Sequence, residues 1–86
     1  MPDLWEAPVK AAIERAQSLF PEGQRFMLEE IDRNSVGNWM ITIGFEMPGG
    51  KMNPFSPLAS QQRIYKQFEL SPDGKQVIRM MMRHVP

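Results

Sequence analysis

Three arginines in the last third of the chain, Arg63, Arg79 and Arg83, are the residues best suited to bind a charged partner. A guanidinium presents a planar fork of N–H donors that matches a carboxylate, and it stays charged at physiological pH. If the segments 63–70 and 76–83 form a hairpin, all three arginines share one face, and Arg63 lies opposite Arg83. Because like charges in opposite positions repel, we expect one of three outcomes. The arginines hold an anion or a partner's carboxylate, an acidic strand neutralises them, or the strand ends splay.

Catalytic and metal chemistry have little support in the sequence. The single histidine, His84, lies close to the C-terminal end of the printed chain, and nucleophilic catalysis would need Ser56 or Ser60 to approach it. The acidic cluster Glu29-Glu30-Asp32 could supply oxygen ligands to a metal, but it is expected on a strand, where successive side chains point to opposite faces. We therefore expect no catalytic residue, no metal site and no cofactor, and we expect that the chain is not an enzyme.

Composition narrows the class of protein further. The chain has 86 residues, with ten basic and ten acidic side chains and no cysteine. Zero net charge makes nucleic acid an unexpected partner, and the lack of cysteine favours a reducing compartment. We see neither a basic and apolar leader nor a run of about 20 apolar residues. We expect a single domain over residues 1–86, located in the cytoplasm, with no membrane association.

The charges are divided unevenly along the chain. Residues 1–46 have eight acidic and four basic side chains, for a net charge of −4, whereas residues 47–86 have two acidic and six basic ones, for +4. Opposite charges stabilise neighbouring strands. We expect the two halves to neutralise each other across the fold, although a dipolar surface that docks on a charged partner is the alternative.

Apolar residues at spacings of three and four predict an amphipathic helix at about residues 8–20. They are Trp5, Val9, Ala12, Ile13, Ala16, Leu19 and Phe20. A helix that began at Asp3 would place Pro8 where its ring clashes with the preceding turn, so we expect the regular helix to begin near Pro8. Pro21 and Gly23 predict its end.

Two strands are predicted after the helix, at about residues 25–33 and 38–46. The second strand alternates cleanly, and its core face has Trp39, Ile41, Ile43 and Phe45. The first strand needs a β-bulge at Glu29-Glu30 to bring its apolar residues to one face. These residues are Phe26, Leu28 and Ile31.

The segment Ser71-Pro-Asp-Gly74 predicts a tight turn between the last two strands, at about residues 63–70 and 76–83. If Ser71 pairs with Lys75, the apolar residues of both strands fall on one face. The resulting pairs are Phe68 with Ile78, Lys66 with Met80 and Ile64 with Met82. We therefore expect Met80 and Met82 in the core. The predicted fold class is α+β, with one N-terminal amphipathic helix packed on a four-stranded antiparallel meander sheet.

Several of these segments resemble a known group of small domains. They are Trp39-Met-Ile-Thr-Ile-Gly-Phe45, Arg63-Ile-Tyr-Lys-Gln-Phe68, Asp73-Gly74 and Val77-Ile-Arg-Met80. Over roughly residues 8–83 the chain is similar to small bacterial α+β domains of PepSY-like or cystatin-like shape. This resemblance implies a helix packed on a meander. PepSY-like domains are commonly exported and associated with peptidase inhibition, and the resemblance assigns no catalytic or ligand residue to this chain.

The sheet face opposite the helix is predicted to be partly apolar, with Met40, Tyr65, Val77 and Met81 on it. Methionine and tyrosine suit an adaptable protein contact. The connection 47–62 has three prolines and two glycines and is predicted as one long loop. Its apolar residues Phe55 and Leu58 either cover this face or join it in one interaction surface.

These features favour a non-enzymatic protein-interaction module that forms a homo-oligomer, expected to be a homodimer, through the outer sheet face or an edge strand. The alternative is a small-ligand or peptide-binding domain in which the loop 47–62 is a lid and Phe55 an anchor. The candidate interaction residues are Met40, Phe55, Arg63, Tyr65, Arg79, Met81 and Arg83.

Overall fold

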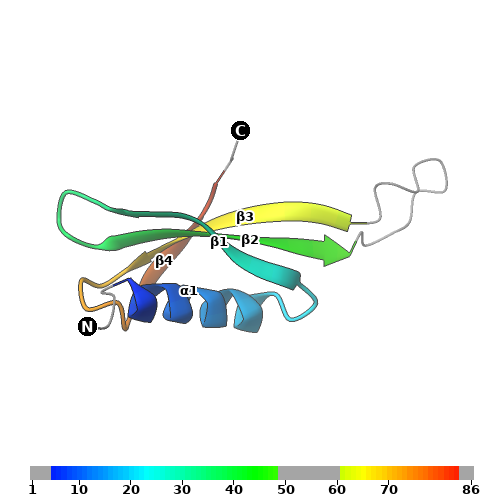
Figure 1. The fold of residues 1–86 in the computed structure, drawn as a ribbon, viewed down its shortest axis with the longest axis horizontal. Coiled ribbons are helices and arrows are strands. Elements are labelled where there is room, and N and C mark those ends of the chain that lie inside the picture. The colour runs from blue at the N-terminus through cyan, green and yellow to red at the C-terminus, as the bar shows by residue number, and fades with distance from the viewer. Residues whose placement is uncertain (1–4, 49–60, 84–86) are drawn as a thin grey trace.

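The computed structural model describes residues 5–48 and 61–83. This part of the chain consists of α1 (Glu6–Leu19), β1 (Gln24–Arg33), β2 (Trp39–Pro48), β3 (Gln61–Leu70) and β4 (Val77–Met82). The strands form one antiparallel sheet in the order β1-β2-β3-β4, and α1 packs across one of its faces (Figure 1). The predicted α+β fold, with a helix on a four-stranded meander, is confirmed, and no element boundary differs from its prediction by more than two residues.

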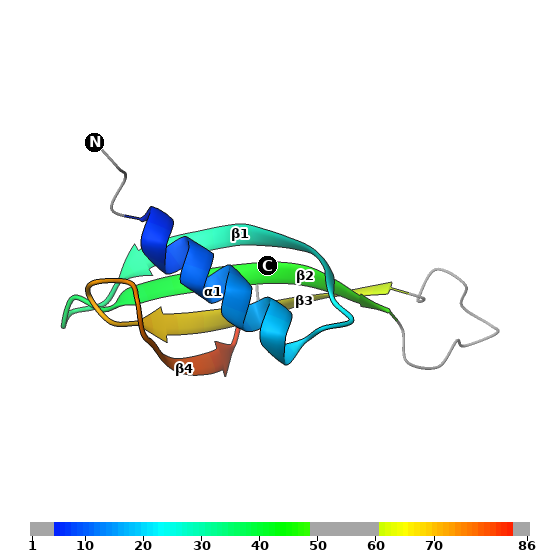
Figure 2. The same cartoon turned by 90° about the horizontal axis from the view of Figure 1, so that it is seen from below.

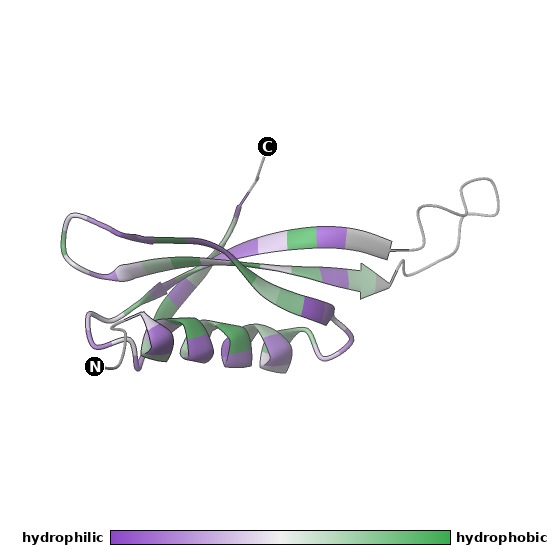
Figure 3. Cartoon of the chain, viewed as in Figure 1, coloured by the Kyte–Doolittle hydropathy of each residue, from purple (hydrophilic) through white to green (hydrophobic). Residues whose placement is uncertain are grey.

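The helix begins at Glu6, two residues earlier than expected, and Pro8 is its third residue. The N–H groups of the first helical turn have no partner within a helix, so a proline there removes no hydrogen bond. Its ring also has no preceding turn to clash with. The helix ends where the Phe20 N–H donates to the Ala16 carbonyl at 2.8 Å, immediately before Pro21. The apolar side of α1 faces the sheet and its hydrophilic side faces away (Figure 3).

The core lies between α1 and the helix-facing side of β2 and β3. The alternating residues predicted for β2 are all buried there, and the full set of buried apolar residues is Val9, Ala12, Ala16, Trp39, Ile41, Ile43, Phe45, Phe68 and Leu70. The Phe45 ring packs against both Phe20 and Phe26, with centroids 4.9 Å apart in each pair. The predicted core face of β2 is therefore confirmed.

The β-bulge predicted in β1 is also confirmed. The pairing of β1 with β2 shifts between Leu28 and Glu30, so Leu28 lies opposite Ile43 and Ile31 opposite Ile41 on the helix-facing side. A second irregularity, not predicted, lies between Gln24 and Met27. There Arg25 adopts a φ of 57°, which is uncommon for a residue with a side chain.

The turn between β3 and β4 is one residue longer than expected. The Ser71 N–H donates to the Gln76 carbonyl at 2.9 Å, so Ser71 pairs with Gln76 and not with Lys75. Two side chains hold this longer turn. The Asp73 carboxylate accepts from the Lys75 N–H at 2.9 Å, and the Ser71 hydroxyl accepts from the Gln76 N–H at 3.1 Å. Gly74 adopts a φ of 74°, a left-handed conformation that glycine adopts without steric cost.

A bulge at Ile78 then shifts the register by a second residue. The observed pairs are Lys66 with Met82, Phe68 with Met80, Glu69 with Arg79 and Leu70 with Val77. The predicted pairs of Phe68 with Ile78, Lys66 with Met80 and Ile64 with Met82 are therefore wrong by two residues. Val77 packs against the core instead of lying on the outer face, since the unpaired residue reverses the alternation at that point.

The ends of the predicted loop 47–62 are strand. β2 continues to Pro48 and β3 begins at Gln61, and these two residues pair with each other. The predictions that concern Phe55 and Leu58 fall outside the described residues. α1 crosses the sheet obliquely (Figure 2). The strand order places β1 at one edge of the sheet and β4 at the other.

Candidate interaction surfaces

The sheet face opposite α1 carries six of the seven predicted interaction residues. They are Met40, Arg63, Tyr65, Arg79, Met81 and Arg83. The side chains of Met40, Tyr65 and Met81 are half-buried. The seventh candidate, Phe55, lies outside the described residues. The six residues do share one face. Whether the arginines among them are free to bind a partner depends on the acidic residues around them.

Arg63 is bound by two carboxylates. Its Nη2 donates to Glu29 Oε2 at 2.9 Å, and its Nη1 lies 3.8 Å from Glu46 Oε2. The hydrogen bond to Glu29 raises the pKa of the Arg63 guanidinium. This pairing depends on Gly44, where an added Cβ would lie 2.6 Å from Glu29 Oε2 and 2.8 Å from Arg63 Nη2. The missing side chain therefore leaves room for an ion pair that spans β1 to β3.

Arg83 binds the next acidic residue of β1. Its Nε donates to Glu30 Oε1 at 2.8 Å and its Nη2 to Glu30 Oε2 at 3.1 Å, the paired geometry that a guanidinium fork favours. The Thr42 hydroxyl donates to the same carboxylate at 3.0 Å. Together the bonds from Arg83 and from Thr42 lower the pKa of the Glu30 carboxyl.

Glu69 collects the third group of contacts and is only 6% exposed. Its Oε2 accepts from Asn38 Nδ2 at 2.7 Å and from Asn34 Nδ2 at 3.0 Å, and its Oε1 accepts from Arg79 Nε at 2.6 Å. The bond from Asn38, followed by that from Arg79, lowers the pKa of the Glu69 carboxyl. This one carboxylate therefore joins the turn between β1 and β2 to the edge strand β4.

The prediction that Arg63 lies opposite Arg83 is wrong, because the shifted register places Tyr65 opposite Arg83. The Arg83 N–H donates to the Tyr65 carbonyl at 3.2 Å. The predicted alternative, neutralisation by an acidic strand, is confirmed, since Glu29 and Glu30 of β1 bind the two arginines. The acidic half of the chain thus meets the basic half across the sheet.

A hollow of about 340 Å³ opens on this face, lined by Glu30, Ile31, Asp32, Met40, Gln67 and Arg83. Its arginine already holds a carboxylate of the same chain. An added anion would therefore have to displace Glu30 from Arg83. The outer face is a layer of internal ion pairs with half-buried methionines and a tyrosine between them.

The free edge of β4 has a different character. Within the described residues β4 has one strand neighbour, β3. In an antiparallel pair, the backbone N–H and C=O groups of successive residues point alternately toward the partner strand and away from it. Since the Arg83 N–H points to β3, the N–H and C=O groups of Met81 also point to β3. The polar backbone groups of Met80 and Met82 therefore face the open edge.

The exposed apolar side chains of β4 include those of the same two residues, Met80 and Met82. Ile78 is 51% exposed, Met80 38% and Met82 71%. The prediction that Met80 and Met82 belong to the core is wrong. The register shift moves both toward the end of the hairpin, and α1 leaves this part of the edge uncovered (Figure 2). β4 thus presents unpaired backbone groups beside exposed apolar side chains.

The opposite edge, β1, is protected in ways that natural sheets commonly use. Two register irregularities interrupt it, and charged residues occupy half of it: Arg25, Glu29, Glu30, Asp32 and Arg33. Bulges and charges on an edge strand discourage the addition of another strand. The charged residues of β4, by contrast, are a single arginine within the strand, which is bound to Glu69.

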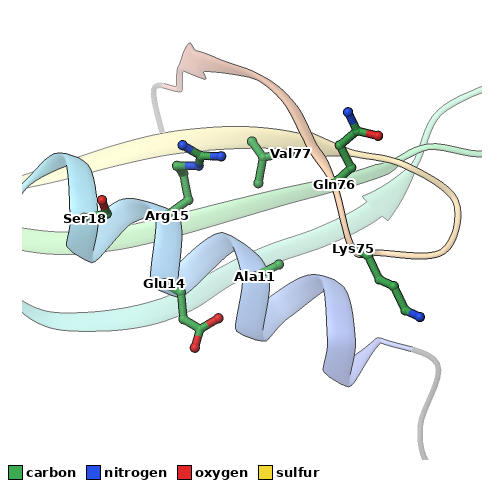
Figure 4. Close-up of a pocket in the computed structure, with 7 residues that line it drawn as sticks. All are labelled: Ala11, Glu14, Arg15, Ser18, Lys75, Gln76 and Val77. Carbon is green, nitrogen blue, oxygen red and sulfur yellow. The ribbon is translucent and has the colours of Figure 1, made fainter.

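A cleft of about 470 Å³ lies between α1 and the start of β4 (Figure 4). Its lining consists of Ala11, Glu14, Arg15, Ser18, Lys75, Gln76 and Val77. Figure 4 shows the Arg15 side chain directed toward β4, while Glu14 and Lys75 extend away from the cleft. Most of this lining is polar and exposed, so the cleft is an open flank of the β4 edge and not an enclosed site.

Comparison with known proteins finds no matching family model, no matching curated protein and no matching solved structure. In the part of the chain that the structure describes, no helix is long and apolar enough to cross a membrane. Among the same residues, no three acidic, histidine or cysteine side chains are grouped so as to hold a metal ion.

Sequence reasoning missed Ile78, Met80 and Met82 as surface residues. Their alternation suited a core strand, and it placed them on the core side of the sheet, where Met80 and Met82 do lie. The available signal was positional: the last strand of a meander is an edge strand, which a single helix crossing the sheet need not cover.

Proposed function

We propose that this chain is a non-enzymatic protein-interaction module that binds by adding an extended strand of a partner to the free edge of β4. In this mode the main-chain groups of Met80 and Met82 supply hydrogen bonds, and exposed apolar side chains supply contact area. The observation that carries the proposal is the coincidence of both features on the same residues of β4.

The outer sheet face fits this role less well. Each of its three arginines is already bound to a carboxylate of the same chain, and a partner would have to break those pairs to use them. Apolar strand addition at β4 leaves the ion-pair layer intact, because Arg79 and Arg83 extend to the other side of the sheet.

Selection from a phage-displayed library of random ten-residue peptides tests this proposal. We expect enriched peptides with alternating apolar residues, since only every second side chain of an added strand faces the side of the sheet that bears Met80. Met80→Pro removes one outward N–H and leaves the β3–β4 hydrogen bonds in place, because proline is tolerated on an edge strand whose N–H faces solvent. Binding should fall at least about tenfold, the equivalent of one lost hydrogen bond.

Met80→Thr is the matched control, because it keeps the N–H and changes only the side chain. It should retain more binding than Met80→Pro, with circular dichroism confirming that both variants are folded. Peptides that bind wild type and Met80→Pro equally well, or a library that yields no binder, would contradict strand addition at β4.

A further inference from the structure

We infer that the strand added to β4 is the β4 of a second copy of this chain, antiparallel to the first and related to it by a two-fold axis at Met80. This inference rests on the proposed function and names the partner. It would join two four-stranded sheets into one continuous sheet with both helices on the same face.

The outward backbone groups are compatible with Met80 as the centre. Two identical antiparallel strands pair symmetrically about one residue, which forms either a hydrogen-bonded or a non-hydrogen-bonded pair with its own copy. The N–H and C=O of Met80 face outward, so two copies of Met80 at the centre would exchange hydrogen bonds directly. A centre at Met81 would place the outward groups of Met80 opposite those of Met82, so the side chains must distinguish the two registers.

The side chains agree with this register. With Met80 on the axis, the exposed Met80 side chains of the two copies meet on the helix-facing side of the sheet. On the other face, Arg79 lies opposite Met81 of the second copy. Centring the pair on Met81 would instead set Arg79 opposite Arg83, a like-charge contact that destabilises a strand pair.

Two identical edges would repel each other if they carried unpaired like charges, and the ion pairs of the sheet remove this repulsion. Arg79 is bound to Glu69 with 2.6 Å between Nε and Oε1, and Arg83 to Glu30 with 2.8 Å between the corresponding atoms. Each copy therefore brings two arginines that are already neutralised, and Val77–Met82 contains no charged residue besides Arg79. An apolar, neutral edge matches its own copy.

The protected β1 edge limits the assembly to two chains. Pairing of β4 with β1 of another copy would be head to tail and would propagate into a fibre. The bulges and charges of β1 oppose that contact. Pairing of β4 with β4 uses both unprotected edges and leaves only the two protected β1 edges.

Cysteine cross-linking on the full chain tests the register directly, because the natural sequence has no cysteine. At the centre of the proposed pair the two Cα atoms of residue 80 would lie about 5.5 Å apart, within the range that a disulfide spans. Ile31→Cys on β1 is the matched control, since Ile31 is 40% exposed and Met80 is 38% exposed. We expect Met80→Cys to form a covalent dimer at least about tenfold faster than Ile31→Cys under mild oxidation.

Light scattering on the wild type at increasing concentration completes the test. The mass should rise to twice that of the chain, and Met80→Lys should stay monomeric while Ile31→Lys dimerises like the wild type. A wild type that stays monomeric up to near-millimolar concentration would overturn the second-copy partner and leave strand addition to be judged by the peptide library. Equal cross-linking of the two cysteine variants, or a dimeric Met80→Lys, would overturn the β4 register.

Discussion

Arg63 and Glu29 form a hydrogen-bonded ion pair, 2.9 Å between Nη2 and Oε2, that reaches across the whole width of β2. The two side chains belong to β3 and β1, which are not neighbours in the sheet. They meet because β2 carries Gly44 at the crossing point. A glycine in the middle of a strand weakens that strand, so its presence here is explained by the pair that it accommodates.

Gly44→Ala should therefore uncouple Arg63 from Glu29 while the chain stays folded. The new methyl group would displace two flexible side-chain ends and no backbone atom, so the fold can adjust. In a double-mutant cycle the coupling between Arg63 and Glu29 should be about 0.5 kcal/mol in the wild type and should approach zero in the Gly44→Ala background. Urea unfolding of the variants measures both values.

The pair of Arg83 with Glu30 is the internal control for this cycle. Its coupling should be the same in both backgrounds, because no atom of either residue is among the nearest neighbours of the Gly44 position. An unchanged coupling of Arg63 with Glu29 after Gly44→Ala would show that the glycine is not what lets them meet.

Gly74→Ala and Gly37→Ala should differ sharply in their effect on stability. Both glycines have a left-handed φ, of 74° and 88° respectively, and share the conformational cost of a side chain there. An added Cβ at Gly74 would also lie 2.6 Å from Pro8 Cδ and 2.8 Å from Pro8 N, whereas Gly37 has open space around it. We expect Gly37→Ala to cost about 1 kcal/mol and Gly74→Ala about 3 kcal/mol.

Chemical denaturation checks this difference, with the unfolding slope confirming that both variants unfold in one cooperative step. Similar losses for the two variants would contradict the close packing of the β3–β4 turn on the start of α1.

Acid should destabilise the fold partly through Glu69. Bonds from Asn38 and from Arg79 lower its pKa below the ordinary value of 4.5, so the unfolded chain binds the proton more readily than the folded one. The stability that Glu69 supplies is complete above pH 4.5 and is lost as the pH falls through the lowered pKa. Free energies of unfolding measured from pH 7 to pH 2 should therefore converge for the wild type and Glu69→Gln at the acid end.

Asn38→Ala provides the matched variant for this titration. It removes the largest cause of the lowered pKa, so the acid loss should begin at higher pH than in the wild type. A constant difference between wild type and Glu69→Gln across the whole pH range would mean that the charge of Glu69 does not stabilise the fold.

Local patterns predicted the elements and the core of this protein well. The alternation from Trp39 to Phe45 identified the core face of β2, and three apolar residues that fit no strict period located the bulge at Glu29-Glu30. These succeed because burial on one face dictates the side-chain period of a strand, and only a bulge reconciles a broken period with one face.

The last hairpin shows where such reasoning stops. Its turn residues matched a shorter loop, but backbone N–H groups that donate to the side chains of Ser71 and Asp73 stabilise a longer one, and Ile78 adds a bulge. A shift of two residues keeps every later side chain on its predicted face, so the alternation could not reveal it. It does change which residues sit beneath α1, and for that reason the exposure of Met80 and Met82 escaped prediction.

The residues of the outer face were predicted, and neutralisation by an acidic strand was one of the predicted outcomes, but the carboxylate that binds each arginine was not predicted. The sequence placed Arg63, Arg79 and Arg83 on one side of the sheet, as observed. Their partners lie on strands whose relative position depends on the entire meander and on the absent side chain of Gly44. Pairings of that kind follow from the assembled sheet and have no local signature.

The cross-sheet ion pairs have a consequence for how the chain folds. Arg63 and Glu29 are 34 residues apart in sequence, and Arg83 and Glu30 are 53 apart. A chain with such distant contacts folds slowly relative to its size, since long segments must be closed before these contacts form. Until then an acidic half and a basic half attract each other through solvent. Added salt should slow refolding by screening that attraction, which stopped-flow fluorescence of the buried Trp39 can follow.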